Sequence, residues 1–126
     1  MYGTQGVAAA NNVPGSRCSG VSWIDNSGNL WLFGGQGYGS TGTVNGDLND
    51  LWEYSPATKE WTWVDGSNTG TQQGPSGVYG TLGVAAATNV PGGRDSAVSW
   101  TDSNGNFWLF GGESAESLND LWRNDP

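Results

Sequence analysis

The chain lacks histidine altogether and has a single cysteine, Cys18, among its 126 residues. One cysteine cannot form an internal disulfide. The usual activator of a thiol nucleophile, an adjacent imidazole, is also missing. We therefore interpret Cys18 as an incidental, partly exposed thiol and not as a catalytic group.

Basic residues are scarce. The 4 Lys and Arg stand against 12 Asp and Glu, which gives a formal net charge of −8. Binding to nucleic acid or to an anionic membrane depends on clustered positive charge, so both are poor partners. No apolar run is long enough for a membrane-spanning helix. The N-terminal residues do not have the pattern of a signal peptide, and we expect none within the chain.

Glycine and tryptophan, in contrast, are abundant. The 22 glycines and 8 tryptophans occur together with many Asn, Ser and Thr residues. This aromatic content is too high for a disordered chain. The combination of turn-forming residues with regularly spaced tryptophans predicts an all-β fold. The length predicts one small domain.

A repeated apolar segment organises the sequence. Residues 29–35, Asn-Leu-Trp-Leu-Phe-Gly-Gly, return as residues 106–112, Asn-Phe-Trp-Leu-Phe-Gly-Gly. Each copy is too short for a helix and rich in strand-forming residues, so it predicts a buried strand that ends at a glycine pair. The repeat covers residues 2–35 and 79–112, with 25 of 34 positions identical at a spacing of 77.

The two copies differ in length after the glycine pair. Residues 48–52, Leu-Asn-Asp-Leu-Trp, return as residues 118–122, so the second copy is seven residues shorter here. Loops tolerate such length changes better than packed strands do, and we predict that Gln36–Asp47 is a surface loop. Its candidate interaction residues are Gln36, Tyr38, Asn45 and Asp47.

Two Asp-containing segments, residues 25–29 and 102–106, predict hairpin turns. Asp and Asn side chains bond to their own backbone, and glycine supplies the left-handed position. The segments also resemble the start of a calcium-binding loop, although the distal glutamate of such a loop is missing. A turn is the favoured interpretation, and calcium binding by Asp25 and Asp102 is left open.

The predicted strands form two blocks separated by connectors rich in Gly and Ala. The first block ends with a strand at residues 60–65, which has Trp61 and Trp63 on one face. The second block has no counterpart of this strand. The predicted segments are a connector (1–16), a four-stranded block (17–66), a second connector (67–93) and a three-stranded block (94–126).

The combined motif of the first block resembles a kelch repeat. It consists of a strand ending in Phe33-Gly34-Gly35, the sequence Asn-Asp-Leu-Trp-Glu-Tyr at residues 49–54, and Pro-Ala-Thr at residues 56–58 followed by Trp61. In kelch proteins this pattern defines one four-stranded antiparallel meander, a blade of a β-propeller. The resemblance implies kelch-type blades and an incomplete propeller, with one whole blade and most of a second. The connectors are similar to those of bacterial tandem kelch proteins of the galactose-oxidase-like type.

The resemblance does not bring an enzymatic activity with it. Galactose oxidase binds copper through histidine and tyrosine, and this chain has no histidine, so we expect neither that activity nor a cofactor. Arg17 and Arg94 match the arginine that often opens a kelch repeat. We predict that each pairs with a neighbouring carboxylate or carbonyl, and that Asp50 and Asp120 are structural rather than catalytic.

Blades bury their faces only against neighbouring blades, and closed propellers need about four to eight of them. We therefore expect either a homo-oligomer, as a ring or a filament, or the remaining blades of a longer chain. The predicted blade core consists of Trp31, Phe33, Gly34, Gly35, Trp52, Trp61, Trp100, Trp108, Phe110, Gly111, Gly112 and Trp122.

Two functions remain as hypotheses. The first is a non-catalytic module for self-assembly and for protein or glycan binding, extracellular or on the cell surface, derived from a larger bacterial kelch protein. The alternative is a part of a propeller enzyme, of the carbohydrate-active hydrolase or lyase type, whose active site needs other blades. A hydrolase would place two carboxylates across a pocket, a distance that sequence alone does not give.

Overall fold

The computed structural model describes residues 1–126, which form an all-β chain without helices. Every strand pair is antiparallel, and neither of the two sheets closes on itself. The first sheet has the order β1-β3-β4-β5 with β2 also paired to β3, and the second has the order β6-β7-β8. The strands are β1 Arg17–Cys18, β2 Val21–Ile24, β3 Leu30–Tyr38, β4 Asn45–Ser55, β5 Glu60–Asp65, β6 Val98–Thr101, β7 Phe107–Phe110 and β8 Leu121–Asn124.

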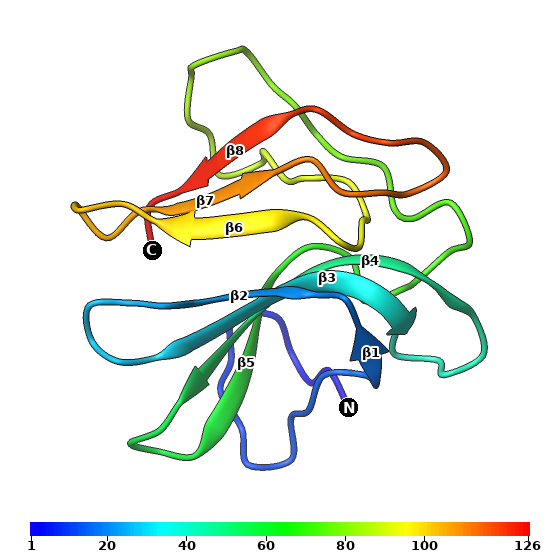
Figure 1. The fold of residues 1–126 in the computed structure, drawn as a ribbon. Coiled ribbons are helices and arrows are strands. Elements are labelled where there is room, and N and C mark those ends of the chain that lie inside the picture. Colours follow the sequence, from blue (N-terminus) through cyan, green and yellow to red (C-terminus); the bar gives the residue numbers. More distant parts are fainter.

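The two sheets lie one above the other (Figure 1). β2 of the first sheet faces β6 of the second. Residues 1–16 run along the first sheet on the side away from the second sheet. The long connector between β5 and β6 passes around the outside of the molecule and projects beyond β8. No helix of the length and hydrophobicity of a membrane span is present.

The alternation of residues along β2 and β3 builds the core between the sheets. Val21 pairs with Phe33 and Trp23 with Trp31, and all four side chains are buried. Residues two apart on a strand point to the same face, so these four form one apolar face of the first sheet. The second sheet covers that face with Phe107, whose ring stacks on Trp23.

The two Asp-containing segments form hairpin turns, as predicted. The Asp25 carboxylate accepts hydrogen bonds from the backbone N–H groups of Ser27 and Asn29, and from Trp31 Nε1 at 3.0 Å. Asp102 accepts the corresponding bonds in the second sheet, including one from Trp108 Nε1 at 2.8 Å. Each aspartate therefore ties a turn to the tryptophan of the following strand.

The glycine pair at residues 34 and 35 allows the sheets to approach. Both residues have positive φ angles, 63° and 93°. A Cβ atom on Gly34 would lie 2.8 Å from the Arg94 carbonyl oxygen of the second sheet. The Gly35 N–H donates to that same carbonyl at 2.9 Å. A larger residue at position 34 would therefore push away the Arg94 segment, and one at position 35 would collide with the Cys18 carbonyl oxygen of its own sheet, 2.6 Å from the added Cβ. Both would also strain the backbone.

The prediction that Gln36–Asp47 is one loop is wrong. β3 and β4 extend through most of this segment, with Gln36 paired to Asp47 and Tyr38 to Asn45, and only residues 39–44 connect them. The length difference between the copies reflects a longer strand pair, because β3 and β4 have 9 and 11 residues whereas β7 and β8 have 4 each. Two glycines of this segment are needed for packing. A Cβ on Gly37 would lie 2.2 Å from the Ser16 carbonyl oxygen, and one on Gly46 would lie 2.1 Å from that of Thr71. The ribbon is glycine-rich because connectors pack directly on its backbone.

Candidate interaction surface

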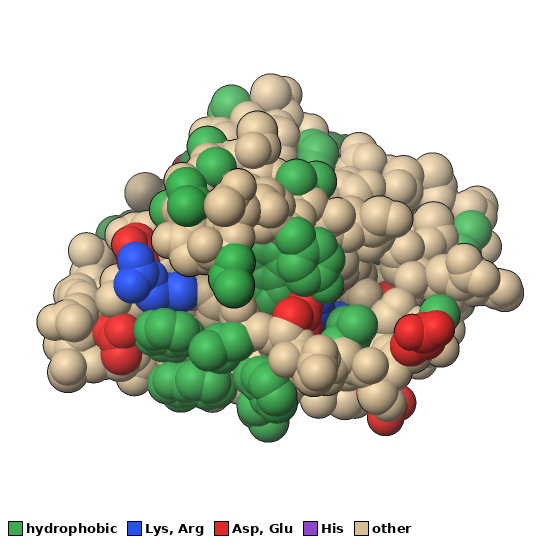
Figure 2. Space-filling model, turned by 90° about the horizontal axis from the view of Figure 1, so that it is seen from above, with side chains coloured by type: hydrophobic (Ala, Val, Ile, Leu, Met, Phe, Trp, Pro, Cys, Tyr) green, Lys and Arg blue, Asp and Glu red, His purple; other side chains and the backbone are tan.

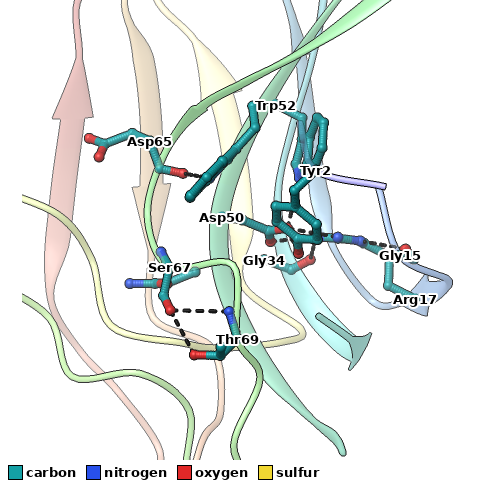
Figure 3. Close-up of polar contacts among 11 residues, drawn as sticks. Tyr2, Gly15, Arg17, Gly34, Asp50, Trp52, Asp65, Ser67 and Thr69 are labelled. Atoms are coloured by element: carbon teal, nitrogen blue, oxygen red, sulfur yellow. Dashed lines mark hydrogen bonds and ion pairs between the residues drawn. The ribbon is translucent and has the colours of Figure 1, made fainter. Parts of the chain in front are cut away.

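A buried polar cluster joins the middle of β4 to β1 and to the N-terminal connector in the first sheet (Figure 3). Arg17 approaches Asp50 with two nitrogens, at 2.5 and 2.8 Å, and also donates to the Gly34 carbonyl. The Asp50 carboxylate accepts two further bonds, from the Tyr2 hydroxyl at 2.5 Å and from Trp52 Nε1 at 2.7 Å. The Asp50 side chain is fully buried. The predicted Arg17 pairing is thus confirmed.

The second sheet contains the same cluster. Arg94 binds Asp120 with two nitrogens, at 2.5 and 2.8 Å, and donates to the Gly111 carbonyl. Tyr79 and Trp122 donate to Asp120 Oδ2, both at 2.7 Å. Burial by itself raises the pKa of Asp120, but the hydrogen bonds from Arg94, Trp122 and Tyr79 outweigh it and hold the pKa well below its ordinary value.

The carboxylates of Asp50 and Asp120 each accept four hydrogen bonds, which limits their capacity to act as a base or a nucleophile. Each carboxylate receives hydrogen bonds from an arginine, a tryptophan and a tyrosine. A general base or a nucleophile needs a free lone pair directed at a substrate. Burial raises the pKa of Tyr2, and the negative charge of Asp50 raises it further, so this phenol is a poor proton donor. The hydrogen bonds of each cluster tie its aspartate to an arginine and a tyrosine from an earlier part of the chain.

Two cavities of about 170 and 310 Å³ open at the surface. The first is lined by 11 residues, which include four glycines as well as Tyr79, Arg94 and Ser114, and the second by Val44 and residues 70–73. Neither lining includes an Asp or a Glu. These cavities therefore do not contain the pair of facing carboxylates that a hydrolase would need. The structure also has no group of three or more His, Cys, Asp or Glu side chains placed to hold a metal ion.

The four predicted interaction residues lie on the β3–β4 ribbon and differ in accessibility. Tyr38 is 38% exposed, and its partner Asn45 is exposed as well. Asp47 is buried, and its backbone N–H donates to the Thr71 carbonyl at 3.1 Å. Burial raises the pKa of Asp47, and the nearby Asp95 carboxylate raises it further. Asp47 is therefore a component of the packed ribbon and is not available to a ligand.

The outer face of the second sheet, which was predicted to be part of the core, is exposed to solvent. Trp100 and Phe110, both predicted as core residues, are 45% and 42% exposed. Val98 and Leu121 on the same sheet are also exposed, while Trp108 is half-buried. Figure 2, which views the molecule from the side of the second sheet, shows hydrophobic side chains gathered in adjoining groups on this surface. The prediction failed for Trp100 and Phe110 because no part of the chain covers this face.

The same residues are buried in the first sheet. At the repeat spacing, Trp100 corresponds to Trp23, which is 8% exposed, and Phe110 corresponds to Phe33, which is 4% exposed. Val98 likewise corresponds to the buried Val21. We call the second-sheet set, Val98, Trp100, Trp108, Phe110 and Leu121, the open face. It is a copy of the surface that the first sheet buries against the second.

The backbone groups beside the open face show the same difference. Arg94 joins the sheets by donating its N–H to the Leu48 carbonyl at 3.1 Å and by accepting from Gly35 N–H. The corresponding groups of the second sheet are the Leu118 carbonyl and the Gly112 N–H, and neither makes such a bond. The Leu118 carbonyl and the Gly112 N–H beside the open face are thus without the hydrogen bonds that join the two sheets at the equivalent position.

Sequence reasoning missed Tyr2 and Tyr79 as members of the polar clusters. Their signal was present, because Tyr-Gly-Thr occurs at residues 2–4 and again at residues 79–81 within the repeat.

A scan of protein-family models finds none that matches this chain, and a search of curated proteins finds no match either.

Proposed function

We propose that this chain is a non-catalytic, self-assembling module of the kelch β-propeller type, whose copies pack head to tail through the open face. The observation that carries the proposal is the contrast between equivalent residues. Trp23 and Phe33 are buried under the second sheet, whereas Trp100 and Phe110 present the same chemistry to solvent. Exposed aromatic patches of this kind typically mark protein interaction sites.

The surface complementary to the open face belongs to the same chain. Phe107 and Leu109 of the second sheet cover the first sheet, and they are 2% and 4% exposed. Their equivalents in the first sheet are Leu30, which is 42% exposed, and Leu32, which is half-buried. A second copy can therefore place its Leu30 side against the open face, in the way that the second sheet already packs on the first.

Such a contact is heterologous, since it joins two different surfaces of the same chain. Heterologous contacts give a ring when the rotation closes and a filament when it does not. A closed propeller has about four to eight blades. With two sheets acting as blades in each chain, a ring would need about two to four copies.

The test is the mass in solution by light scattering, with a matched pair of variants. Phe110→Asp places a charge in the open face. Val44→Asp places one at a residue of similar exposure, 40%, in the loop between β3 and β4. We expect the wild type and Val44→Asp to have the same mass, a multiple of 13.2 kDa, and Phe110→Asp to be a monomer with wild-type circular dichroism. A monomeric wild type, or an assembled Phe110→Asp, would contradict the proposal.

For the assembled module we propose a protein- or glycan-binding role outside the cell or on its surface. Tyr38 is the accessible aromatic residue of the β3–β4 ribbon, with the polar Asn45 opposite it. An aromatic ring beside amide groups suits stacking on a sugar together with hydrogen bonding. A glycan array of the assembled protein checks this: we expect hits that are lost in Tyr38→Ala. An array without hits would remove the glycan version and leave the protein version.

A further inference from the structure

We propose that the second sheet carries a preformed slot for one extended peptide strand of the pattern Trp-x-Trp. The slot lies between the free edge of β8 and the connector residues 79–90. It is separate from the open face, and it does not depend on the proposed stacking of copies. The first sheet shows the same slot filled, because β5 occupies the corresponding place.

β5 is held from both sides in the first sheet. On one side it pairs with β4, with Trp63 opposite Trp52 and Trp61 opposite Tyr54. On the other side the N-terminal connector donates to it. The Gly6 N–H reaches the Trp63 carbonyl at 2.8 Å, and Asn12 Nδ2 reaches the Trp61 carbonyl at 2.9 Å.

An aromatic contact completes the filled slot. The Tyr2 ring lies edge-on between two indoles, with centroid distances of 4.8 Å to Trp52 and 5.3 Å to Trp63. Tyr2 is only 4% exposed as a result. Trp63 of β5 is therefore one of the two aromatic neighbours of Tyr2.

The second sheet has the walls that face Trp63, and Asn124 stands where Tyr54 packs on Trp61 in the first sheet. Residues 1–126 place no strand between these walls. β8 pairs with β7 alone, which leaves its other edge open. Tyr79 keeps its ring 5.0 Å from Trp122, yet it is 56% exposed. Asn89 Nδ2 donates to the Val84 carbonyl at 3.1 Å, as Asn12 does to Val7, but has no second acceptor.

The connector is already in the conformation that holds a strand. Gly80 and Gly83 have φ angles of 62° and 77°, close to the 68° and 77° of Gly3 and Gly6. The loop is closed at its base by paired hydrogen bonds between Val78 and Val90. The Gly83 N–H, which corresponds to the donor at Gly6, has no acceptor within the chain. Preorganised donors lower the entropic cost of binding.

The chemistry of the slot selects its occupant. An open strand edge and free N–H donors recognise an extended backbone, which is strand addition. The space beside Tyr79 and Trp122 suits an indole, as Trp63 shows in the first sheet. Arg123, at the position of Glu53, already pairs with Asp125 at 3.0 Å and would face the middle of a bound strand, as Glu53 faces Thr62, so the indole and the extended backbone define the ligand.

The test is fluorescence anisotropy of a labelled synthetic peptide of residues 55–66, titrated with the complete chain. We expect saturable binding by the wild type, at least about tenfold weaker binding by Tyr79→Ala, and unchanged binding by Tyr38→Ala. A peptide with alanine in place of both tryptophans should bind at least about tenfold more weakly as well. Absence of saturable binding, or equal affinities of wild type and Tyr79→Ala, would overturn the proposal.

Amide hydrogen exchange locates the bound peptide and separates this proposal from that of self-assembly. We expect the peptide to slow exchange at Gly83 and Ala86, whose equivalents donate to β5 in the first sheet. The Phe110→Asp variant, which tests the stacking of copies, should bind the peptide as tightly as the wild type. Protection confined to the open face, or loss of binding in Phe110→Asp, would show that the peptide sits elsewhere and would overturn the slot.

Discussion

The ring of Trp23 stacks on the ring of Phe107 across the two sheets, with centroids 5.2 Å apart and planes 11° from parallel. Trp23 Nε1 also donates to the Trp108 carbonyl at 3.2 Å. This one side chain therefore joins the sheets by both an aromatic contact and a hydrogen bond. Its equivalent in the second sheet, Trp100, stacks only on Trp108 of its own sheet.

The pair Trp23 and Trp100 gives a matched test of the core. We expect Trp23→Ala to lower the free energy of unfolding by about 3–5 kcal/mol, as large-to-small changes in a core do. Trp100→Ala, measured at a concentration at which the chain is monomeric, should lower it by less than about 1 kcal/mol because its ring is 45% exposed. Urea unfolding followed by circular dichroism measures both. Equal losses would contradict the assignment of the core.

The pair Tyr2 and Tyr79 tests the polar clusters. Tyr2→Phe removes a buried donor from Asp50 and should cost about 1–3 kcal/mol. Tyr79→Phe removes the same donor from Asp120, but the phenol is exposed, so water can replace it and we expect a loss below about 1 kcal/mol. Thermal unfolding of the two variants gives the comparison. A larger loss for Tyr79→Phe would mean that the first cluster is the weaker one.

The pKa of Asp120 predicts a loss of stability in acid. Its folded-state pKa lies well below the ordinary value, so its ionised form stabilises the fold fully above about pH 4, where the carboxylate is also ionised in the unfolded chain. That stabilisation decreases as the pH falls toward the folded-state pKa. Asp102, whose pKa is lowered to about 2 by hydrogen bonds from Trp108 and Asn106, acts in the same direction. Unfolding midpoints measured between pH 2 and pH 6 should therefore fall steadily below pH 4, and an Asp120→Asn variant should show a smaller decrease.

Asp47 predicts the opposite trend. Its pKa is raised in the folded chain by burial and by the charge of Asp95. The folded state is therefore favoured while Asp47 is protonated, and this contribution is lost as the pH rises through the raised pKa. Asp47→Asn, which is neutral at every pH, should stabilise the chain at pH 7 by about 0.5 kcal/mol. The gain should vanish at pH 3, and a gain that is equal at both pH values would exclude a role for the charge.

The features that sequence predicted correctly are those set by local patterns. β5 has the predicted bounds, residues 60–65, because a turn precedes it and its tryptophans alternate. The Asp25 and Asp102 turns also agree, because each aspartate bonds to the backbone two and four residues later. Sequence predicted that Arg17 and Arg94 pair with a carboxylate or a carbonyl, but it did not identify the distant partners Asp50 and Asp120.

The features that it missed depend on contacts between distant segments. The length difference between the copies predicted a loop at residues 36–47, whereas β3 and β4 extend through most of it. The close packing of Gly37 on Ser16 and of Gly46 on Thr71 in this ribbon is not visible in the sequence. Trp100 and Phe110 were predicted as core residues because they occupy the same positions of the repeat as Trp23 and Phe33. Whether a patterned face is covered depends on what packs against it, which the pattern does not specify.

The unbonded Leu118 carbonyl and Gly112 N–H beside the open face give the proposed assembly a direction. Each copy that docks there would bring its own Leu118 and Gly112, so every addition regenerates an acceptor of the same kind. Such an assembly stops growing only when the last copy contacts the first and closes a ring. A copy that can dock but has a disabled open face, such as Phe110→Asp, would then act as a terminator, and small amounts of it would shorten every chain that it joins.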